Sequence, residues 1–377
     1  MNEPLVTRLT QLRRDLHRIP EVDFDLPETI AYVRSVIEPI AERMRTQGHE
    51  AEVLSPSRSA LCLFIDRGTP TTTAIRTDMD ALPVTEQTGR AFASQHQGKM
   101  HACGHDGHMA MVLALSETLE RRCDELEESV LLVFQPAEET TGGARLICES
   151  GIFERLHVRR IFGFHLWPDL EKGVIASRSG GLLAASNETT VTFEGIASHI
   201  AKAEQGRDSL EAGCRFVGRA YDYIARRAIE EPCLLKFGRM TSGEVRNQIS
   251  ARTVLEGSLR TFSLGMRESC QADLTVIAHR CAGEAGCTAN VHFSEGYPPV
   301  VNDAEVFAQV REALPQLQEL EEPLLIAEDF AWYQQWIPGV FLLLGTGTGI
   351  PLHADTFDFD EAILAHGVEA YLRLLGL

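Results

Sequence analysis

The chain has 377 residues, more than a single hydrophobic core usually organises, so we expect two domains. Hydrophobic residues make up 44% and charged residues 24%, which is the composition of an ordinary water-soluble globular protein. The formal net charge of −19 disfavours nucleic acid and an anionic membrane surface as partners, because phosphate groups attract basic faces.

The helical spacing of the leucines predicts a first helix over residues 5–19, which Pro20 ends, and a second helix follows over 27–44. Near-continuous apolar runs predict buried strands over residues 60–65, 71–76, 129–134, 160–164 and 340–344. A further helix is expected over 109–121. Such strands alternating with helical stretches are typical of a mainly parallel sheet with helices on both faces.

The pattern changes between residues 181 and 293. Strands with one exposed face are expected at 189–193 and 248–259, and helices at 208–227 and 264–280. These elements favour a small α+β insert whose sheet is covered on one side. We therefore predict an α/β protein with a discontinuous first domain, residues 1–180 and 294–377, interrupted by a smaller α+β domain, residues 181–293.

The cysteines and the N-terminus bear on location. Nine cysteines without regular spacing are not typical of a disulfide framework. The N-terminus lacks a basic start followed by an apolar segment, and no apolar run approaches the ~20 residues that span a bilayer. We expect reduced thiols and a cytoplasmic protein.

Residues 100–108 gather three histidines, a cysteine and an aspartate, which are residue types that bind metal ions. Cys103 and His105 stand two apart, so on an extended segment both side chains point the same way. The alternative is a helix start whose polar residues cap the first turn. We expect Cys103 and His105 to be ligands, with His101 and His108 in supporting positions.

Further polar residues follow the predicted strands, where open α/β sheets bind ligands. They are Asp78, Asp80, Glu138, Glu139, His165 and His353. Adjacent carboxylates on one turn cannot face the same way, so one glutamate could bind metal while the other acts as a general base. The alternatives are a solvated acidic turn and strand-end caps. Asp78 and Asp80 could orient a ligand imidazole, and we count Asp80 among the catalytic residues.

The five candidate ligands exceed what one tetrahedral zinc site with an open water position needs, and they suit two cations. They are Cys103, His105, Glu139, His165 and His353. A thiolate ligand favours zinc, and carboxylate also admits manganese.

Several segments together resemble the metal-dependent amidohydrolases of the aminoacylase/carboxypeptidase family. The resemblance is strongest to the branch with hippurate hydrolase, auxin-conjugate hydrolase and N-acetyldiaminopimelate deacetylase. The segments are residues 13–21, 78–83, 101–106, 135–139, 142–144, 165, 195–199, 328–330 and 352–353. One departure lies at 202–204, Lys-Ala-Glu, where relatives carry a second histidine.

The resemblance implies a catalytic domain interrupted by a lid domain that forms a homodimer or homotetramer. It implies that the five candidate ligands bind two divalent ions, zinc, manganese, nickel or cobalt, and that Glu138 is the general base. His199 would help hold the oxyanion, and Asn247 and Arg260 would contact the substrate carboxylate or the dimer partner. For Arg260, a surface salt bridge is the alternative.

The implied reaction is hydrolysis of an N-acyl, N-acetyl-type amino acid to a carboxylate and a free amino acid. Closely related alternatives are N-acetyldiaminopimelate deacetylase and a metallo-carboxypeptidase or dipeptidase. Alternatives of another kind are a thiol hydrolase that uses Cys103 as its nucleophile and a metal-loaded binding protein without catalytic activity.

Overall fold

The computed structural model describes residues 3–140 and 142–377; Met1, Asn2 and Thr141 lie outside the described residues. The chain divides into two compact units. The first comprises residues 1–180, 302–321 and 329–377, and the second comprises 181–301 and 322–328. The sequence pattern places the return at 294, whereas the chain stays with the second unit to residue 301, because Tyr297 pairs with Ser186 in an isolated bridge.

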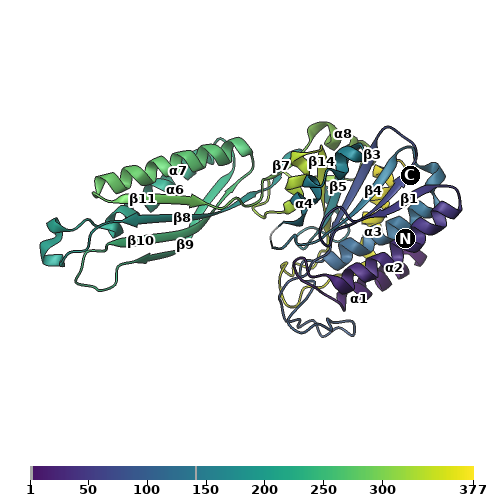
Figure 1. The fold of residues 1–377 in the computed structure, drawn as a ribbon, viewed down its shortest axis with the longest axis horizontal. Coiled ribbons are helices and arrows are strands. Elements are labelled where there is room, and N and C mark those ends of the chain that lie inside the picture. Colours follow the sequence, from purple (N-terminus) through teal and green to yellow (C-terminus); the bar gives the residue numbers. More distant parts are fainter. Residues whose placement is uncertain (1–2, 141) are drawn as a thin grey trace. The chain divides into compact units, whose positions relative to one another are not determined.

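The first unit contains an eight-stranded sheet in the order β1-β2-β4-β3-β5-β14-β6-β13 (Figure 1). Its strands are β1 (Glu50–Leu54), β2 (Leu61–Asp66), β3 (Thr72–Asp78), β4 (Ser129–Gln135), β5 (Val158–Trp167), β6 (Ile175–Ser177), β13 (Gln318–Glu319) and β14 (Gly339–Gly345). The central strands β4, β3, β5 and β14 run parallel to one another. The α/β class with a mainly parallel sheet is therefore confirmed.

Strand β2 departs from the parallel arrangement expected of all five apolar runs. It pairs antiparallel with both β1 and β4. Only residues 67–71 connect β2 to β3, and a parallel crossover needs a dozen or more residues. The short connection reverses the chain direction, so the apolar run at 60–65 forms an antiparallel strand.

Helices cover both faces of this sheet. They are α1 (Glu3–His17), α2 (Pro27–Thr46), α3 (His105–Arg121), α4 (Gly143–Glu149), α5 (Ile152–Arg155), α8 (Ala304–Ala313) and α9 (Leu364–Leu374), with short turns η1 (Cys123–Glu125), η3 (Asp329–Gln335) and η4 (Glu361–Ile363). Val340 and Leu342 of β14 join the core that contains α1, α3 and α9. Between them, the Phe341 ring lies 4.8 Å from that of Phe330 in η3. Because side chains alternate along a strand, η3 covers the opposite face.

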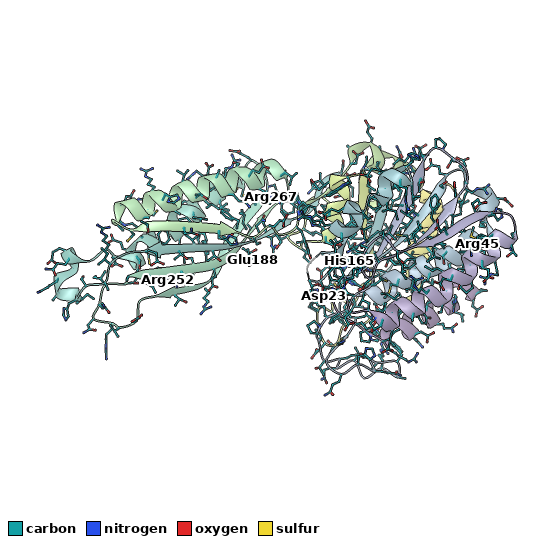
Figure 2. All side chains as sticks on the ribbon, viewed as in Figure 1. Asp23, Arg45, His165, Glu188, Arg252 and Arg267 are labelled. Atoms are coloured by element: carbon teal, nitrogen blue, oxygen red, sulfur yellow. The ribbon has the colours of Figure 1, made fainter. Side chains whose placement is uncertain are left out.

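The second unit is a four-stranded antiparallel sheet in the order β11-β8-β10-β9 with two helices packed against it. Its elements are β7 (Gly180–Leu183), β8 (Ala185–Glu194), η2 (Ile200–Gln205), α6 (Ser209–Arg227), β9 (Cys233–Ser242), β10 (Arg252–Thr261), α7 (Leu264–Glu284), β11 (Thr288–Phe293) and β12 (Val300–Asn302). Burial alternates along β8, so one face of the sheet is exposed. Figure 2 labels Glu188 of β8 and Arg252 of β10 on this sheet.

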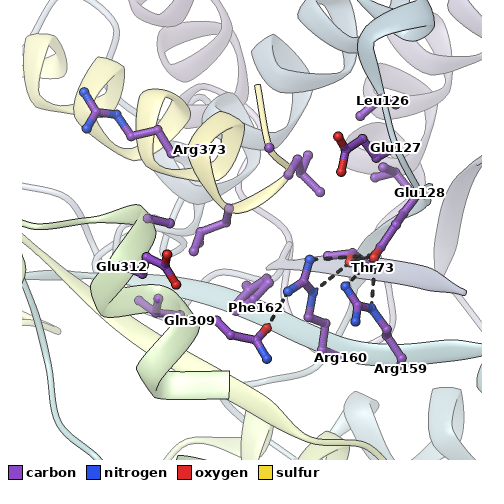
Figure 3. A pocket seen from close by; sticks show the side chains of 16 residues that line it. Thr73, Leu126, Glu127, Glu128, Arg159, Arg160, Phe162, Gln309, Glu312 and Arg373 are labelled. Carbon is purple, nitrogen blue, oxygen red and sulfur yellow. Dashed lines mark hydrogen bonds and ion pairs between the residues drawn. The ribbon is translucent and has the colours of Figure 1, made fainter. Parts of the chain in front are cut away.

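A cleft of about 510 Å³ lies where strands β3 and β4 begin, lined by Thr73, Val130, Arg160 and residues of α8 and α9 (Figure 3). Arg160 donates from Nη1 to Gln309 and from Nε to Thr73. None of the site residues predicted from the sequence lines this cleft. Among residues 3–140 and 142–377, no helix is both long enough and apolar enough to cross a bilayer.

Candidate metal centre

The carboxyl ends of the parallel strands collect the predicted side chains of the first unit. Asp78 ends β3, the Glu138-Glu139 turn follows β4, and His165 lies near the end of β5. Helix α3 begins at His105. Since parallel strands end at the same edge of a sheet, residues far apart in the sequence converge there.

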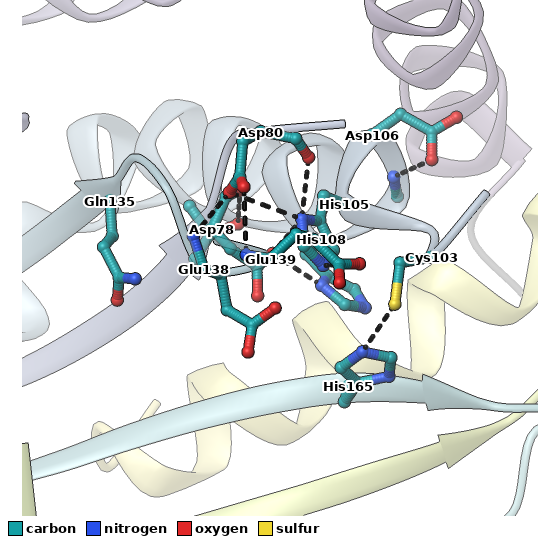
Figure 4. A network of polar contacts seen from close by, with 12 residues as sticks. Asp78, Asp80, Cys103, His105, Asp106, His108, Gln135, Glu138, Glu139 and His165 are labelled. Atoms are coloured by element: carbon teal, nitrogen blue, oxygen red, sulfur yellow. Dashed lines mark hydrogen bonds and ion pairs between the residues drawn. The ribbon is translucent and has the colours of Figure 1, made fainter. Parts of the chain in front are cut away.

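The five candidate ligands form a compact cluster, and Figure 4 labels four of them: Cys103, His105, Glu139 and His165. Cys103 Sγ lies 3.4 Å from both His165 Nε2 and His353 Nε2. Glu139 Oε1 lies 3.3 Å from His353 Nε2 and 3.9 Å from His105 Nε2. Two groups whose ligand atoms lie within 4.8 Å of one another share Cys103: one adds His105 and His165, the other Glu139 and His353. Overlapping groups with a common thiol suit two neighbouring cations with a bridging ligand.

Main-chain carbonyls fix the orientation of two imidazoles. His105 donates from Nδ1 to the Asp80 carbonyl at 2.8 Å, and His165 donates from Nδ1 to the Leu166 carbonyl at 2.7 Å. A ring that donates from Nδ1 keeps a lone pair on Nε2 when it is neutral. In both residues it is Nε2 that faces the other candidate ligands.

A buried atom without a partner supports a cation at this place. His105 Nε2 is buried and has no hydrogen-bond partner, and Glu139 Oε1, which lies 3.3 Å from His353 Nε2, is buried beside it. Burial and the nearby carboxylates of Glu139 and Glu138 hold the pKa of the Cys103 thiol well above its ordinary value. A divalent cation would supply positive charge to these groups and a partner to His105 Nε2. The residues present therefore fit a metal centre.

The remaining ligand candidates also have shifted pKa values. Burial, with the neighbouring His108 charge, lowers the pKa of His165 to about 3, so its ring is neutral at physiological pH. Burial favours the neutral form of Glu139, but the His353 hydrogen bond and the charge of His105 outweigh it and lower the pKa to about 2. The same hydrogen bond raises the pKa of His353. Glu139 is thus an anion and the His165 ring is neutral, as metal ligands must be, whereas His353 must give up a proton before it can bind a cation.

The Asp80 carboxylate holds the turn that carries the two glutamates. Its Oδ1 accepts from the Glu138 N–H at 2.9 Å and its Oδ2 from the Glu139 N–H at 3.0 Å. The sequence predicted that this carboxylate orients a ligand imidazole. The carboxylate lies 3.8 Å from His105 Nδ1, beyond hydrogen-bonding distance. The main-chain carbonyl of the same residue takes that position, which leaves the carboxylate free for the two N–H groups.

Asp78 was expected to orient a ligand imidazole, and its carboxylate instead binds His108, which is not one of the five candidate ligands. Its Oδ1 accepts from His108 Nδ1 at 2.7 Å, and His108 Nε2 accepts from the Leu166 N–H at 2.9 Å. Sequence reasoning missed Arg76, which is fully buried and contacts Asp78 at 2.7 Å and Asp329 at 2.9 Å. An arginine in the middle of an apolar strand run is the signal that could have indicated buried acids nearby.

Glu138 lies on the same turn as Glu139 but in different surroundings. Its Oε1 accepts from the Asp329 N–H at 3.4 Å, and the residue is 7% exposed. One candidate group also contains Glu138 with His105 and Glu139. The carboxylate therefore stands beside the ligand cluster with some access to solvent, as a proton acceptor for an attacking water must.

His199, Asn247 and Arg260 belong to the second unit. His199 is exposed at the start of η2, and its Nδ1 accepts from the Ala201 N–H at 3.1 Å. The Asn247 carbonyl accepts from the Ile200 N–H at 3.0 Å, so these two residues share one end of the unit. Arg260 pairs with Ser186 near the other end of β10, and the structure does not bring it to His199. Burial lowers the pKa of Arg260, and its Nη1 has no hydrogen-bond partner.

Comparison with known proteins identifies the family. The model of peptidase family M20/M25/M40 matches residues 74–376. The chain belongs to this family. The sequence resemblance is thereby confirmed, together with the predicted class of metal-dependent amide hydrolase.

Individual relatives match along nearly the whole chain. An N-acetyldiaminopimelate deacetylase of Streptococcus uberis is 34% identical over 97% of this chain and 98% of the relative. A deacetylase of the same name from Lacticaseibacillus casei is 34% identical and covers 97% of both. Among solved structures, a dinuclear metal-binding peptidase of the M20 family from Bacillus subtilis is 30% identical, with a TM-score of 0.85 over 99% of this chain and 98% of that one.

Proposed function

We propose that this chain removes acyl groups from N-acyl amino acids, with N-acetyldiaminopimelate as the first substrate to test. The family supports the reaction class, and the curated relatives named for that deacetylation match almost the full length of the chain. The alternative of a carboxypeptidase or dipeptidase shares the same bond chemistry and differs in what flanks the amide.

The observation that carries the proposal is the division of labour between Glu138 and Glu139. Both residues lie on one turn, whose N–H groups are bound by the Asp80 carboxylate. Glu139 reaches into the cluster of thiol and imidazole ligands, where its pKa is lowered to about 2. Glu138 is bound through the Asp329 N–H beside that cluster. A metal-loaded binding protein needs the ligand, but it does not need the second carboxylate.

We infer that Cys103, His105, Glu139, His165 and His353 hold two divalent cations. When bound, such cations lower the pKa of a water molecule and polarise a carbonyl group. Glu138 accepts the proton of the attacking water and returns it to the nitrogen of the breaking amide bond. The products are a carboxylate and a free amine. Glu138 therefore acts first as the proton acceptor and then as the proton donor. His199 is the proposed oxyanion donor from the second unit.

The thiol-hydrolase alternative is less well supported. A catalytic cysteine needs a lowered thiol pKa, whereas burial and nearby carboxylates raise the pKa of Cys103. The thiol also lies between two imidazoles and beside a carboxylate, as a metal ligand would.

The finer properties are also proposals. Thiolate with imidazole favours zinc, and the carboxylate of Glu139 leaves manganese, nickel and cobalt open. We propose a homodimer or homotetramer formed by the second unit, which exposes large apolar side chains such as Ile200 (52%) and Val245 (55%). The nine free cysteines support a reducing, cytoplasmic environment.

The test is hydrolysis of N-acetyldiaminopimelate, other N-acetyl amino acids and dipeptides by apo-protein reloaded with each metal. Glu138→Gln should reduce turnover about 10²- to 10⁴-fold while two ions still bind. Glu127→Gln, which alters an exposed glutamate of the first unit, is the matched control and should keep full turnover. Equal turnover in Glu138→Gln would rule out the proposed mechanism. Preferred cleavage of dipeptides would show that the substrates are peptides and not N-acyl amino acids.

A further inference from the structure

Arg13 of helix α1 contacts two of the segments that carry candidate ligands of the metal centre. The side chain is almost fully buried, but Arg13 is not one of the candidate metal ligands. Its Nε donates to Asp106 Oδ2 at 2.8 Å. Its Nη2 lies 2.9 Å from Asp358 Oδ1. Asp106 follows the candidate ligand His105 in sequence, and Asp358 lies five residues after His353.

The segment after His353 needs external support. His353 has φ of +67°, a left-handed conformation that residues with a side chain seldom adopt. Its N–H donates to the Ala102 carbonyl at 2.9 Å, which joins it to the segment that carries Cys103. A loop held in such a conformation stays there only if the surrounding contacts fix it.

Close packing accompanies the charged contacts. A Cβ on Gly104 would lie 3.4 Å from the Phe357 ring, and one on Gly107 would lie 2.8 Å from the Phe359 ring. The Phe359 ring also lies 4.5 Å from the Arg13 guanidinium carbon, and the Phe92 ring lies 4.9 Å from it. The loop therefore packs on the glycines of the α3 N-terminus with Arg13 filling the space beside them.

Asp106 is directed away from the ligand cluster (Figure 4). Its Oδ1 accepts from the Gly107 N–H at 2.9 Å in the first turn of α3, and its Oδ2 is shared by Arg13 and His17 Nδ1, the latter at 2.7 Å. The guanidinium thus connects the first turn of α3 to the loop of His353. Cys103 Sγ and His353 Nε2 lie 3.4 Å apart on the other side of this connection.

We propose that Arg13 is a positioning residue that sets the separation between the Cys103–His105 ligands and His353, and thereby the affinity of the centre for its second cation. This inference rests on the proposed function only through the ligand set. A planar guanidinium binds two carboxylates in fixed directions, whereas a lysine ammonium is a single point charge. A positive charge without the planar guanidinium, as in Arg13→Lys, should therefore not reproduce the effect of Arg13.

The test compares Arg13→Lys, Arg13→Met and Asp358→Asn with wild type. Arg14→Met is the matched control. Arg14 contacts Glu361 at 2.7 Å, and Arg13 Nη1 lies 3.5 Å from the same glutamate; both arginines also lie over the Phe92 ring. The Arg14 side chain, however, is 43% exposed and does not bridge the two segments. Zn²⁺ and Mn²⁺ affinity and stoichiometry are measured by competition with a chromophoric chelator, with near-ultraviolet circular dichroism as the control for folding.

We expect Arg13→Lys and Asp358→Asn to bind the weaker ion about 10-fold less tightly, as loss of outer contacts to metal ligands does, and the double variant to add little more. Arg14→Met should match wild type. If folded Arg13→Lys and Asp358→Asn bind both ions within twofold of wild type, the inference is wrong; Asp358→Asn decides if Arg13 variants do not fold. If wild type binds no ions, the proposed function fails instead.

Discussion

His105 and Asp80 are joined through the main chain: the imidazole Nδ1 donates to the Asp80 carbonyl at 2.8 Å, while the carboxylate of Asp80 binds the N–H groups of Glu138 and Glu139. One residue therefore fixes the imidazole of a candidate ligand with its backbone and the glutamate turn with its side chain. Substitutions of the side chain should separate these two tasks.

We predict that Asp80→Asn keeps both metal ions and turns over more slowly. The amide retains one acceptor oxygen for the turn, so one of the two hydrogen bonds is lost and the other becomes a neutral one, which costs about 1.5 kcal/mol and corresponds to roughly tenfold in turnover. The His105 contact is untouched because the carbonyl remains. Metal analysis together with kcat on an N-acetyl amino acid would check this; loss of metal in the folded variant would contradict it.

The mainly parallel sheet and the strand-end position of the candidate ligands were accessible from the sequence because continuous apolar runs indicate covered parallel strands. The runs ending near Asp78, Gln135 and Trp167 all became β3, β4 and β5. Strands β1, β9 and β11 are among those that no predicted run covers. Residues 236–242 of β9 are largely exposed, so its outer half lacks the apolar pattern of a buried strand.

The contacts behind the ligands could not be predicted. Whether Asp80 offers its carboxylate or its carbonyl to His105 depends on the position of a turn almost sixty residues away, which no local pattern encodes. Arg76 and Arg13 were recognisable only as charges in apolar or helical stretches; their acidic partners Asp329 and Asp358 come from the far end of the chain. Such pairings depend on tertiary structure.

Metal binding should release protons, and more of them at lower pH. The Cys103 thiol has a raised pKa, so it holds its proton in the apo-protein near neutral pH. It gives that proton up when a metal ion binds. The pKa of His353 is raised above 6.5 by Glu139, so stabilisation by this pair is present below the ordinary pKa and disappears as pH rises through the raised one. We expect about one proton released at pH 8.5, approaching about two at pH 6.

Calorimetric titration of apo-protein with Zn²⁺ in buffers of different ionisation enthalpy would measure this release. Cys103→Ser should remove the part that persists at high pH, and affinity should fall as pH falls in both proteins. A release that does not depend on pH between 6 and 8.5 would show that His353 does not exchange a proton for metal.

His199→Ala should lower turnover without changing metal content. Its ring lies in the second unit and its Nδ1 accepts from Ala201, which leaves Nε2 as the donor for a developing negative charge. Loss of one such donor costs about 3 kcal/mol, or 10²- to 10³-fold in kcat. The measurement is kcat and KM with two bound ions. His279→Ala, in helix α7 of the same unit, serves as the control and should leave kcat unchanged.

Gly104→Ala should weaken the metal centre without touching a ligand. Gly104 lies between Cys103 and His105 with φ of +88°, and a Cβ there would lie 2.8 Å from Leu166 Cδ1. The left-handed conformation costs an alanine about 1–2 kcal/mol, and the contact with Leu166 forces a further shift of the segment. We expect a lower melting temperature of apo-protein and weaker Zn²⁺ binding. Gly151→Ala, also at positive φ (+72°) but with open space around its Cβ, should lower stability alone; equal Zn²⁺ affinity in both variants would contradict the prediction.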